Sequence, residues 1–220
     1  MLSIVEICAL DDPLLLPWLD LYETAFPPGE RILVSHVLNV LHNRARGVDH
    51  GSHLLAAVQD GDEPPAGVAA TNVGPSQKKN FAGIIFDYEP RDSAAAFLWY
   101  FAVDPRQRGQ GLGTRVYQRL LERLDPQVRA LIFDLEDPAF MKTEAAVRQA
   151  ERRIEFYRRL GARLLGGICY VQTVGPHQPP LPLLLMVHPI KEISPQEAFE
   201  LAREEFGGEI LSQVGELCWE

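Results

Sequence analysis

Residues 95–103, AAFLWYFAV, constrain the fold more than any other part of the chain. This stretch has almost no polar residue, and a strand that is apolar on both faces lies inside a sheet. Asp104 and Pro105 end the apolar run, and after a glycine-rich loop a helix is predicted from Thr114 to Leu124. The sequence therefore predicts an α/β arrangement built around a buried central strand.

The periodicity of apolar residues predicts further elements on both sides of this strand. The other strand-like stretches are 3–9, 53–59, 66–73, 83–88, 129–135, 163–174 and 181–188. The helical patterns cover 13–26, 30–46, 143–160 and 194–206. We expect one α/β (α+β) domain over residues 1–220, with a mixed central sheet of about seven strands and flanking helices. Its core should span about residues 3–190, and residues 194–220 should form a C-terminal helix and a tail.

Composition excludes several classes of function. The 220 residues carry a formal net charge of −9, which argues against binding nucleic acid or an anionic membrane surface. The first residues lack the pattern of a signal peptide, and three dispersed cysteines favour reduced thiols in a cytoplasmic protein. We expect Cys8 and Cys169 to be buried. Four histidines lie near one another in the sequence: His36, His42, His50 and His53. Their spacing matches no metal-binding motif, so no metal site is predicted.

The loop after the central strand predicts an anion site. In VDPRQRGQGLGTR, residues 103–115, three glycines alternate and arginines stand on both sides of them. Glycines let the backbone approach a ligand closely, and the N–H groups at a helix N-terminus favour a phosphate or pyrophosphate. Arg108 and Arg115 could add charge-assisted hydrogen bonds. A flexible glycine turn without a ligand is the alternative.

Two other phosphate ligands fit the glycine spacing less well. A dinucleotide fingerprint requires GxGxxG and an acidic residue about 20 positions later, which Asp134 would supply. However, the third glycine, Gly113, comes one position early, and Thr114 takes the required place. The chain has no GxxxxGK[ST] motif for a nucleoside triphosphate.

The segment Val103 to Gly113 resembles the acyl-CoA-binding motif of the GNAT (Gcn5-related) acetyltransferases, in which Arg108, Gly111 and Gly113 fill the characteristic places. The stretch FYRRLGA at residues 156–162 resembles the second signature of that family, a Tyr four residues before a glycine that ends a helix. The order of elements is similar from Ser3 to Val187. This resemblance implies acetyl-CoA as cosubstrate, bound by Phe101, Ala102, Val103, Arg108, Gly109, Gln110, Gly111, Leu112, Gly113, Thr114 and Tyr157. The chain departs from the family pattern at Ala150, where Asn is common, at Ala162, and in a longer stretch over 137–150.

The resemblance also implies catalytic roles. Tyr157 would protonate the departing thiolate. Its helical spacing alone predicts only an aromatic side chain packed on the apolar face of the helix. Glu136, at a strand end, is the expected general base. Asp134, Glu30, Glu89 or an ordered water are the alternatives for that role.

The sequence thus favours an N-acetyltransferase that acts on a primary amine of a small molecule or peptide. A CoA-binding sensor without transfer activity is the first alternative. A nicotinamide-dependent oxidoreductase is the second, and the glycine spacing disfavours it. The acceptor amine and the acyl chain length stay open, and a homodimer is possible by resemblance to the family.

Overall fold

The computed structural model describes residues 1–60, 79–172 and 180–220. They group into two compact units, Met1–Tyr88 with Trp99–Leu124 and Glu89–Leu98 with Asp125–Glu220. The predicted strand at 66–73 falls outside the described residues. The hydrogen-bonded order of the strands is β1-β2-β3-β4-β5-β7-β6-β8. Their bounds are β1 Leu2–Glu6, β2 Ser52–Asp60, β3 Lys79–Tyr88, β4 Ala95–Val103, β5 Ala130–Glu136, β6 Arg163–Gln172, β7 Leu181–Pro189 and β8 Leu211–Trp219.

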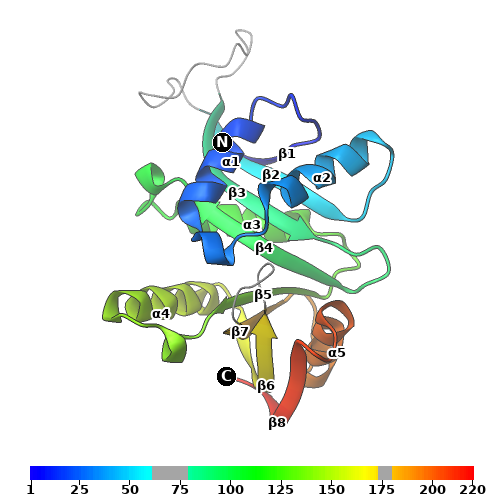
Figure 1. Ribbon diagram of the computed structural model, residues 1–220, viewed down its shortest axis with the longest axis vertical. Coiled ribbons are helices and arrows are strands. Elements are labelled where there is room, and N and C mark those ends of the chain that lie inside the picture. The colour runs from blue at the N-terminus through cyan, green and yellow to red at the C-terminus, as the bar shows by residue number, and fades with distance from the viewer. Residues whose placement is uncertain (61–78, 173–179) are drawn as a thin grey trace. The chain divides into compact units, whose positions relative to one another are not determined.

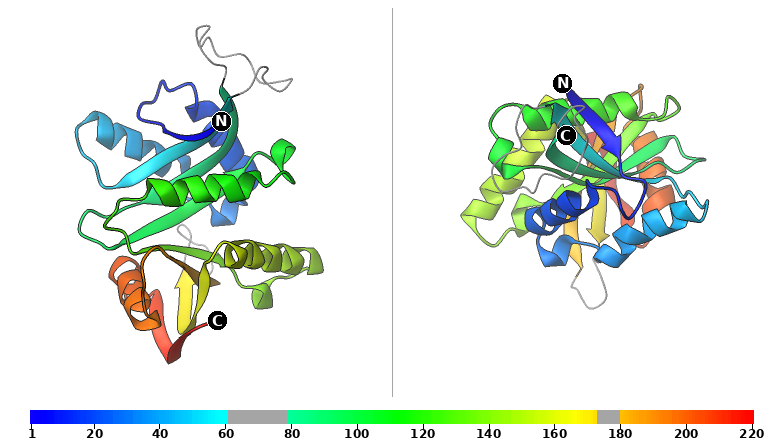
Figure 2. Two further views of the ribbon diagram at one scale, coloured as in Figure 1. Left: turned by 180° about the vertical axis from the view of Figure 1, so that it is seen from behind. Right: turned by 90° about the horizontal axis from the view of Figure 1, so that it is seen from above.

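The first unit packs helices on both faces of antiparallel strands. Figures 1 and 2 show α1 and α2 on one face of these strands and α3 on the other. The bounds of the helices are α1 Leu15–Ala25, α2 Val34–Ala45 and α3 Leu112–Arg123. Trp18 and Tyr22 of α1 are fully buried, and the ring of Tyr22 meets that of Tyr100 edge-to-face at 4.8 Å. These aromatic side chains form the core beneath α1, as their helical spacing predicts.

The second helix begins later than predicted because a distant side chain holds the chain before it. Residues Pro28–Glu30 form a 3₁₀ turn, and α2 starts only at Val34. The hydroxyl of Tyr100 on β4 donates to the carbonyl of Glu30 at 3.0 Å and accepts from the amide of Ile32 at 3.0 Å. These two hydrogen bonds, made across 70 and 68 residues of sequence, fix the segment between the helices.

The second unit contains β5, β7, β6 and β8 with two helices, α4 Glu144–Arg159 and α5 Pro195–Phe206. Figure 1 shows α4 beside β5, and α5 beside β6 and β8. The start of β4 pairs in parallel with β5, Ala95–Phe97 against Ala130–Ile132, and β7 pairs antiparallel with β5. Ser194 and Glu197 form the capping box of α5, as predicted from their spacing.

The mixed sheet with flanking helices confirms the predicted fold class, but the sheet has eight strands rather than about seven. The eighth is β8, formed by the segment that we expected to be a tail. Its side chains are mostly exposed, so it carries little apolar periodicity. Pairing with β6 makes it a strand, with Leu211 buried opposite Tyr170.

The prediction that Cys8 and Cys169 are buried is wrong. Cys8 and Cys169 are exposed free thiols. Cys169 lies on β6 next to the buried Tyr170, and consecutive side chains of a strand point to opposite faces. Cys8 comes two residues after the end of β1.

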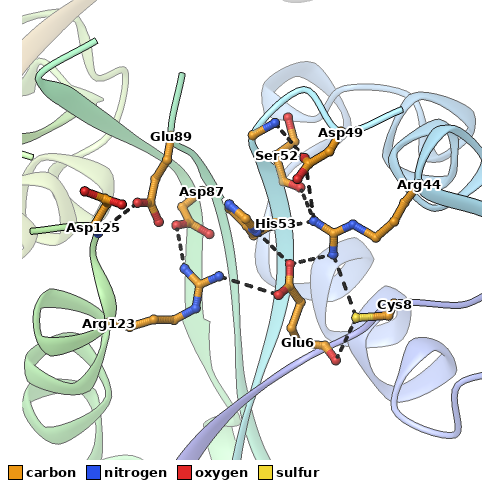
Figure 3. A network of polar contacts seen from close by, with 11 residues as sticks. Glu6, Cys8, Arg44, Asp49, Ser52, His53, Asp87, Glu89, Arg123 and Asp125 are labelled. Carbon is orange, nitrogen blue, oxygen red and sulfur yellow. Dashed lines mark hydrogen bonds and ion pairs between the residues drawn. The ribbon is translucent and has the colours of Figure 1, made fainter. Parts of the chain in front are cut away.

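A polar network, which we call the Glu6 network, ties several elements of the first unit together (Figure 3). Glu6 Oε1 lies 2.5 Å from Arg44 Nη1 and 2.6 Å from His53 Nδ1. Arg123 of α3 pairs with the buried Asp87 at 3.4 Å and approaches Glu6 at 3.7 Å. Burial opposes the charge on Glu6, but the hydrogen bonds and charges of His53 and Arg44 prevail and lower its pKa to about 2. The network therefore links β1, α2, β2, β3 and α3.

Within the described ranges, no helix is long and apolar enough to cross a membrane. In the same ranges, no three His, Cys, Asp or Glu side chains are grouped so that they could hold a metal ion.

Candidate active site

The loop between β4 and α3 begins with an anchored turn. The buried carboxylate of Asp104 accepts hydrogen bonds from the amide of Arg106 at 2.9 Å and from its guanidinium at 2.7 Å. Arg106 thereby holds the pKa of Asp104 below its usual range. The 3₁₀ turn Pro105–Gln107 follows from this cap. Arg106 is thus engaged in building the loop.

Gln107 fastens the same turn to the neighbouring strands. Its side-chain amide donates to the carbonyl of Phe81 at 2.9 Å, and its oxygen accepts from Gln59 at 2.9 Å. A bulge in the β2–β3 pairing leaves Ala82 without a partner in the register, and its carbonyl accepts from the amide of Asp104 at 2.9 Å. These hydrogen bonds hold the start of the loop against β2 and β3.

The glycines have the conformation that an anion site needs. Gly109 and Gly111 have φ of +82° and +68°, where a side chain would be strained. Gly111 is the N-cap of α3 and offers no side chain to its first turn, which also has no acidic residue. The first helical hydrogen bond of α3 runs from Arg115 N to Gly111 O. The N–H groups of residues 112–114 precede that bond and remain as donors for a ligand.

Two arginines flank this cradle, which we define as residues 108–115. Arg108 and Arg115 are exposed, and neither guanidinium group makes a hydrogen bond or ion pair with any described residue. Gln110 is also exposed, whereas the side chain of Leu112 is buried. Leu112 can therefore contribute only its backbone. Two exposed guanidinium groups, the positive end of the helix dipole and the backbone donors are the features that an anion site requires.

The β4 residues expected to bind the cofactor lie just before the loop. Phe101 and Val103 are half-buried, Ala102 is buried, and all three come after the residues that pair with β5. The ring of Phe101 packs against Tyr117 of α3 at 6.1 Å.

Tyr157, in the second unit, lies on the buried face of α4. Its ring contacts Phe133 of β5 at 4.4 Å and Phe156 at 5.0 Å. Burial raises its pKa; the charge of Arg153 opposes the shift and that of Glu136 adds to it. The phenol therefore keeps its proton at neutral pH and can serve as a hydrogen-bond donor. As predicted, α4 ends just before Gly161, which has a φ of +103°.

Glu136 also lies in the second unit, in an ion pair with Arg153 of α4. Its side chain is 14% exposed. The guanidinium of Arg153 therefore already occupies a carboxylate oxygen of Glu136. The structure thus groups the predicted acid and the predicted base around one arginine, and that arginine engages the base.

The alternative bases have different surroundings. Glu30 precedes α2 in the first unit, and Glu89 in the second accepts from the amide of Asp125 at 3.0 Å. Asp134 of β5 accepts from the hydroxyl of Tyr170 at 2.9 Å. Burial raises the pKa of Asp134 to about 6; Tyr170 opposes this shift and the charge of Glu136 adds to it.

Sequence reasoning missed the residues that support the named ones. Asp104 and Gln107 secure the loop, and Tyr170 with Gln172 accompanies Asp134. Only Asp104 had a local signal, since Asp before Pro suits the start of a short turn. Gln107 and Tyr170 act through contacts with residues 26 and 36 positions away in the sequence, and Gln172 acts through Tyr170.

Proteins of known structure share this fold. A protein assigned to the GNAT family from Bacteroides thetaiotaomicron has a similar structure, with a TM-score of 0.66 and 22% identity over 94% of this chain and 96% of that one. A Salmonella typhimurium protein, solved with its cofactor acetyl-CoA, matches with a TM-score of 0.51 and 15% identity over 88% and 96% of the two chains.

A curated relative matches more locally. L-2,4-diaminobutyric acid acetyltransferase from Nocardia farcinica is 36% identical over an alignment of 86 residues that covers 37% of this chain. The chain matches about 40% of the length of that relative. The model of the Acetyltransferase (GNAT) family matches residues 15–162, which include the cradle and Tyr157. The chain therefore belongs to the GNAT acetyltransferase family.

Proposed function

We propose that the protein is an N-acetyltransferase that moves an acetyl group from acetyl-CoA to a primary amine. The observation that carries this proposal is the cradle in a member of this family. It has two positive-φ glycines, a helix N-terminus without a side-chain cap, and two arginines whose guanidinium groups have no partner among the described residues. Related structures hold acetyl-CoA, a ligand with a pyrophosphate that such a cradle suits.

The cosubstrate would bind along β4 and the cradle. The pyrophosphate would accept from the backbone between Gly109 and Thr114 and from the guanidinium of Arg108. The pantetheine arm would pair with the backbone of Phe101 and Val103, which lie beyond the residues joined to β5. α4 buries Ala150 where many relatives carry Asn, so this contact to the arm would be missing.

In the reaction, the amine nitrogen forms a bond to the acetyl carbon and the carbon–sulfur bond breaks. The amine gives up one proton, and the departing thiolate gains one. Tyr157 would donate to the sulfur. The pKa of its phenol, about 10 in a free tyrosine and raised further by burial, lies above that of a free thiol, near 8.5. The phenol therefore stabilises the developing thiolate mainly as a hydrogen-bond donor.

Calorimetric titration with acetyl-CoA tests the binding step. We expect wild-type binding, weakened at least about tenfold in Arg108→Ala because a charge-assisted hydrogen bond is lost. Gly111→Val should weaken it as well, since valine resists a φ of +68°. Arg119→Ala is the matched control, because Arg119 is an exposed arginine of α3 that pairs with Glu122. Failure of the wild type to bind would refute the proposal.

The transfer step is tested by following free CoA thiol with a panel of amines, with acetyl-CoA alone as the blank. L-2,4-Diaminobutyrate belongs in the panel because of the relative that acts on it. Tyr157→Phe should slow thiol release without weakening the binding of acetyl-CoA. Acetyl-CoA binding without thiol release from any amine would favour a CoA-binding sensor instead.

A further inference from the structure

Three polar side chains of the second unit form a directed chain of hydrogen bonds. The amide of Gln172 donates to the hydroxyl oxygen of Tyr170 at 2.7 Å, and that hydroxyl lies 2.9 Å from Asp134 Oδ2. A phenol has one proton, and its oxygen already accepts from Gln172, which donates through an amide N–H. The proton of Tyr170 is therefore directed to Asp134, whose Oδ2 acts as the acceptor.

The chain of hydrogen bonds is held rigidly. Tyr170 is 3% exposed, and its ring packs against Phe206 of α5 at 5.2 Å. Tyr170 and Gln172 are two residues apart on β6 and therefore share a face of the strand. Asp134 keeps part of its surface exposed, and its Oδ1 makes no hydrogen bond to a described residue. One carboxylate oxygen is thus fixed by Tyr170, and the other is left for a ligand.

The position of Asp134 on β5 complements that of the predicted acid. Phe133, the preceding residue, contacts Tyr157 of α4. Consecutive side chains of a strand point to opposite faces, so Asp134 points away from the face on which Phe133 contacts Tyr157. Acetyl transfer needs a proton donor at the sulfur and a proton acceptor at the nitrogen. Tyr157 would meet the first need and Asp134 the second.

The charges around Asp134 suit a base. In the strand register its neighbour on β7 is Leu185, which is uncharged. Glu136, two residues along β5, raises the pKa of Asp134, and Arg153 pairs with Glu136. With a pKa of about 6, Asp134 is mostly ionised at pH 7 and is better matched to proton abstraction than an ordinary carboxylate. Glu136, by contrast, is already engaged by a guanidinium.

We propose that Asp134 is the general base of the acetyl transfer, and that Tyr170 and Gln172 are positioning residues that orient its carboxylate. This role rests on the proposed N-acetyltransferase function. As the nitrogen–carbon bond forms, the nitrogen becomes acidic and its proton passes to Asp134 Oδ1. The carbon–sulfur bond breaks, and the departing thiolate accepts a hydrogen bond from Tyr157 and takes its proton from water. Exchange with water then removes the proton from Asp134.

The test is the pH dependence of kcat/KM, measured as thiol release between pH 5 and 9 with the best amine of the panel. Asp134→Asn, which is nearly isosteric, should lower kcat by roughly 10²- to 10⁴-fold while the Kd for acetyl-CoA stays the same. Circular dichroism checks that the variant is folded. The ionisation of the amine itself is common to all variants, so differences between their profiles report on the enzyme.

Two further variants should move the acidic limb of the profile in opposite directions. Tyr170→Phe removes a donor that stabilises the charged Asp134, so the limb should move to higher pH. Glu136→Gln removes a charge that raises the pKa of Asp134, so the limb should move to lower pH. A purely structural role for Tyr170 would lower activity without moving the limb.

The outcomes separate the two proposals. A wild type that releases no thiol with any amine refutes the transferase function and the base assignment together. An active wild type with Asp134→Asn within about threefold of it in kcat refutes the base assignment alone, since a general base contributes at least roughly 10²-fold. An unmoved acidic limb in Tyr170→Phe likewise refutes the positioning role.

Discussion

The Glu6 network should make the stability of the first unit depend on pH, and Glu6→Gln isolates its contribution. The pKa of Glu6 falls from 4.5 to about 2 on folding. That difference corresponds to roughly 3 kcal/mol at about 1.4 kcal/mol per pH unit. The side chain keeps 29% of its surface exposed, so solvent screening reduces the figure to roughly 1–2 kcal/mol.

The sign follows from the direction of the shift. A carboxylate with a lowered pKa stabilises the folded state above pH 4.5, and this stabilisation disappears as the pH falls towards 2. His53 acts in the opposite sense. Burial opposes the shift, but the Glu6 hydrogen bond and the charge of Asp87 raise its pKa above 6.5. Its contribution is complete below pH 6.5 and is lost as the pH rises through the raised pKa.

Urea unfolding between pH 2.5 and 8 measures both effects. The fully buried Trp18 lies in the same unit and provides the fluorescence signal. Above pH 4.5 Glu6→Gln should be about 1–2 kcal/mol less stable than the wild type, and the two curves should converge towards pH 2. Glu144→Gln is the matched control, because Glu144 pairs with Arg148 but is 90% exposed. A difference that persists unchanged from pH 4.5 to 2.5 would refute the reasoning.

Three other substitutions test local geometry by urea unfolding or calorimetry. Gly111→Ala should lower the free energy of unfolding by roughly 1–2 kcal/mol, because alanine is strained at the left-handed φ of this position. A Cβ at Gly111 would meet no atom within 4 Å, so the backbone strain is the whole effect. Gly29→Ala is the control, since a Cβ there is equally unobstructed and the φ is not positive, and its stability should be nearly unchanged. Gly167→Ala should cost roughly 2–4 kcal/mol, since its φ is +80° and its Cβ would lie 2.2 Å from the carbonyl oxygen of Glu216; a smaller loss would mean that β8 shifts easily. Gln107→Leu should cost roughly 1–3 kcal/mol and weaken the binding of acetyl-CoA, and unchanged binding would show that the cradle keeps its shape without this anchor.

The cradle could be predicted from sequence because its geometry is local. A buried strand, a turn opened by Asp104 and glycines before a helix determine where the backbone donors lie. The helix that carries Tyr157 could also be predicted from sequence, because Thr143 caps its start and Gly161 follows its end.

Features set by distant contacts could not be predicted in this way. The late start of α2 depends on Tyr100, and the surroundings of Asp134 depend on Tyr170, which is 36 residues away. Neither contact leaves a periodic trace in the sequence. Our proposal for the general base therefore needed the structure, in which Glu136 pairs with Arg153 and Asp134 Oδ1 makes no hydrogen bond to a described residue.

The strand β8 has a consequence for unwanted pairing with strands of other chains. It ends the strand order, so among the described strands it pairs on one side only, with β6. An open edge of this kind invites strands of other chains, and charged side chains on it are a common defence against aggregation. β8 carries Glu216 beside the exposed Val214, and its pairing with β6 is interrupted by a bulge. Replacing that glutamate with an apolar residue would turn the edge into a candidate site of intermolecular sheet growth.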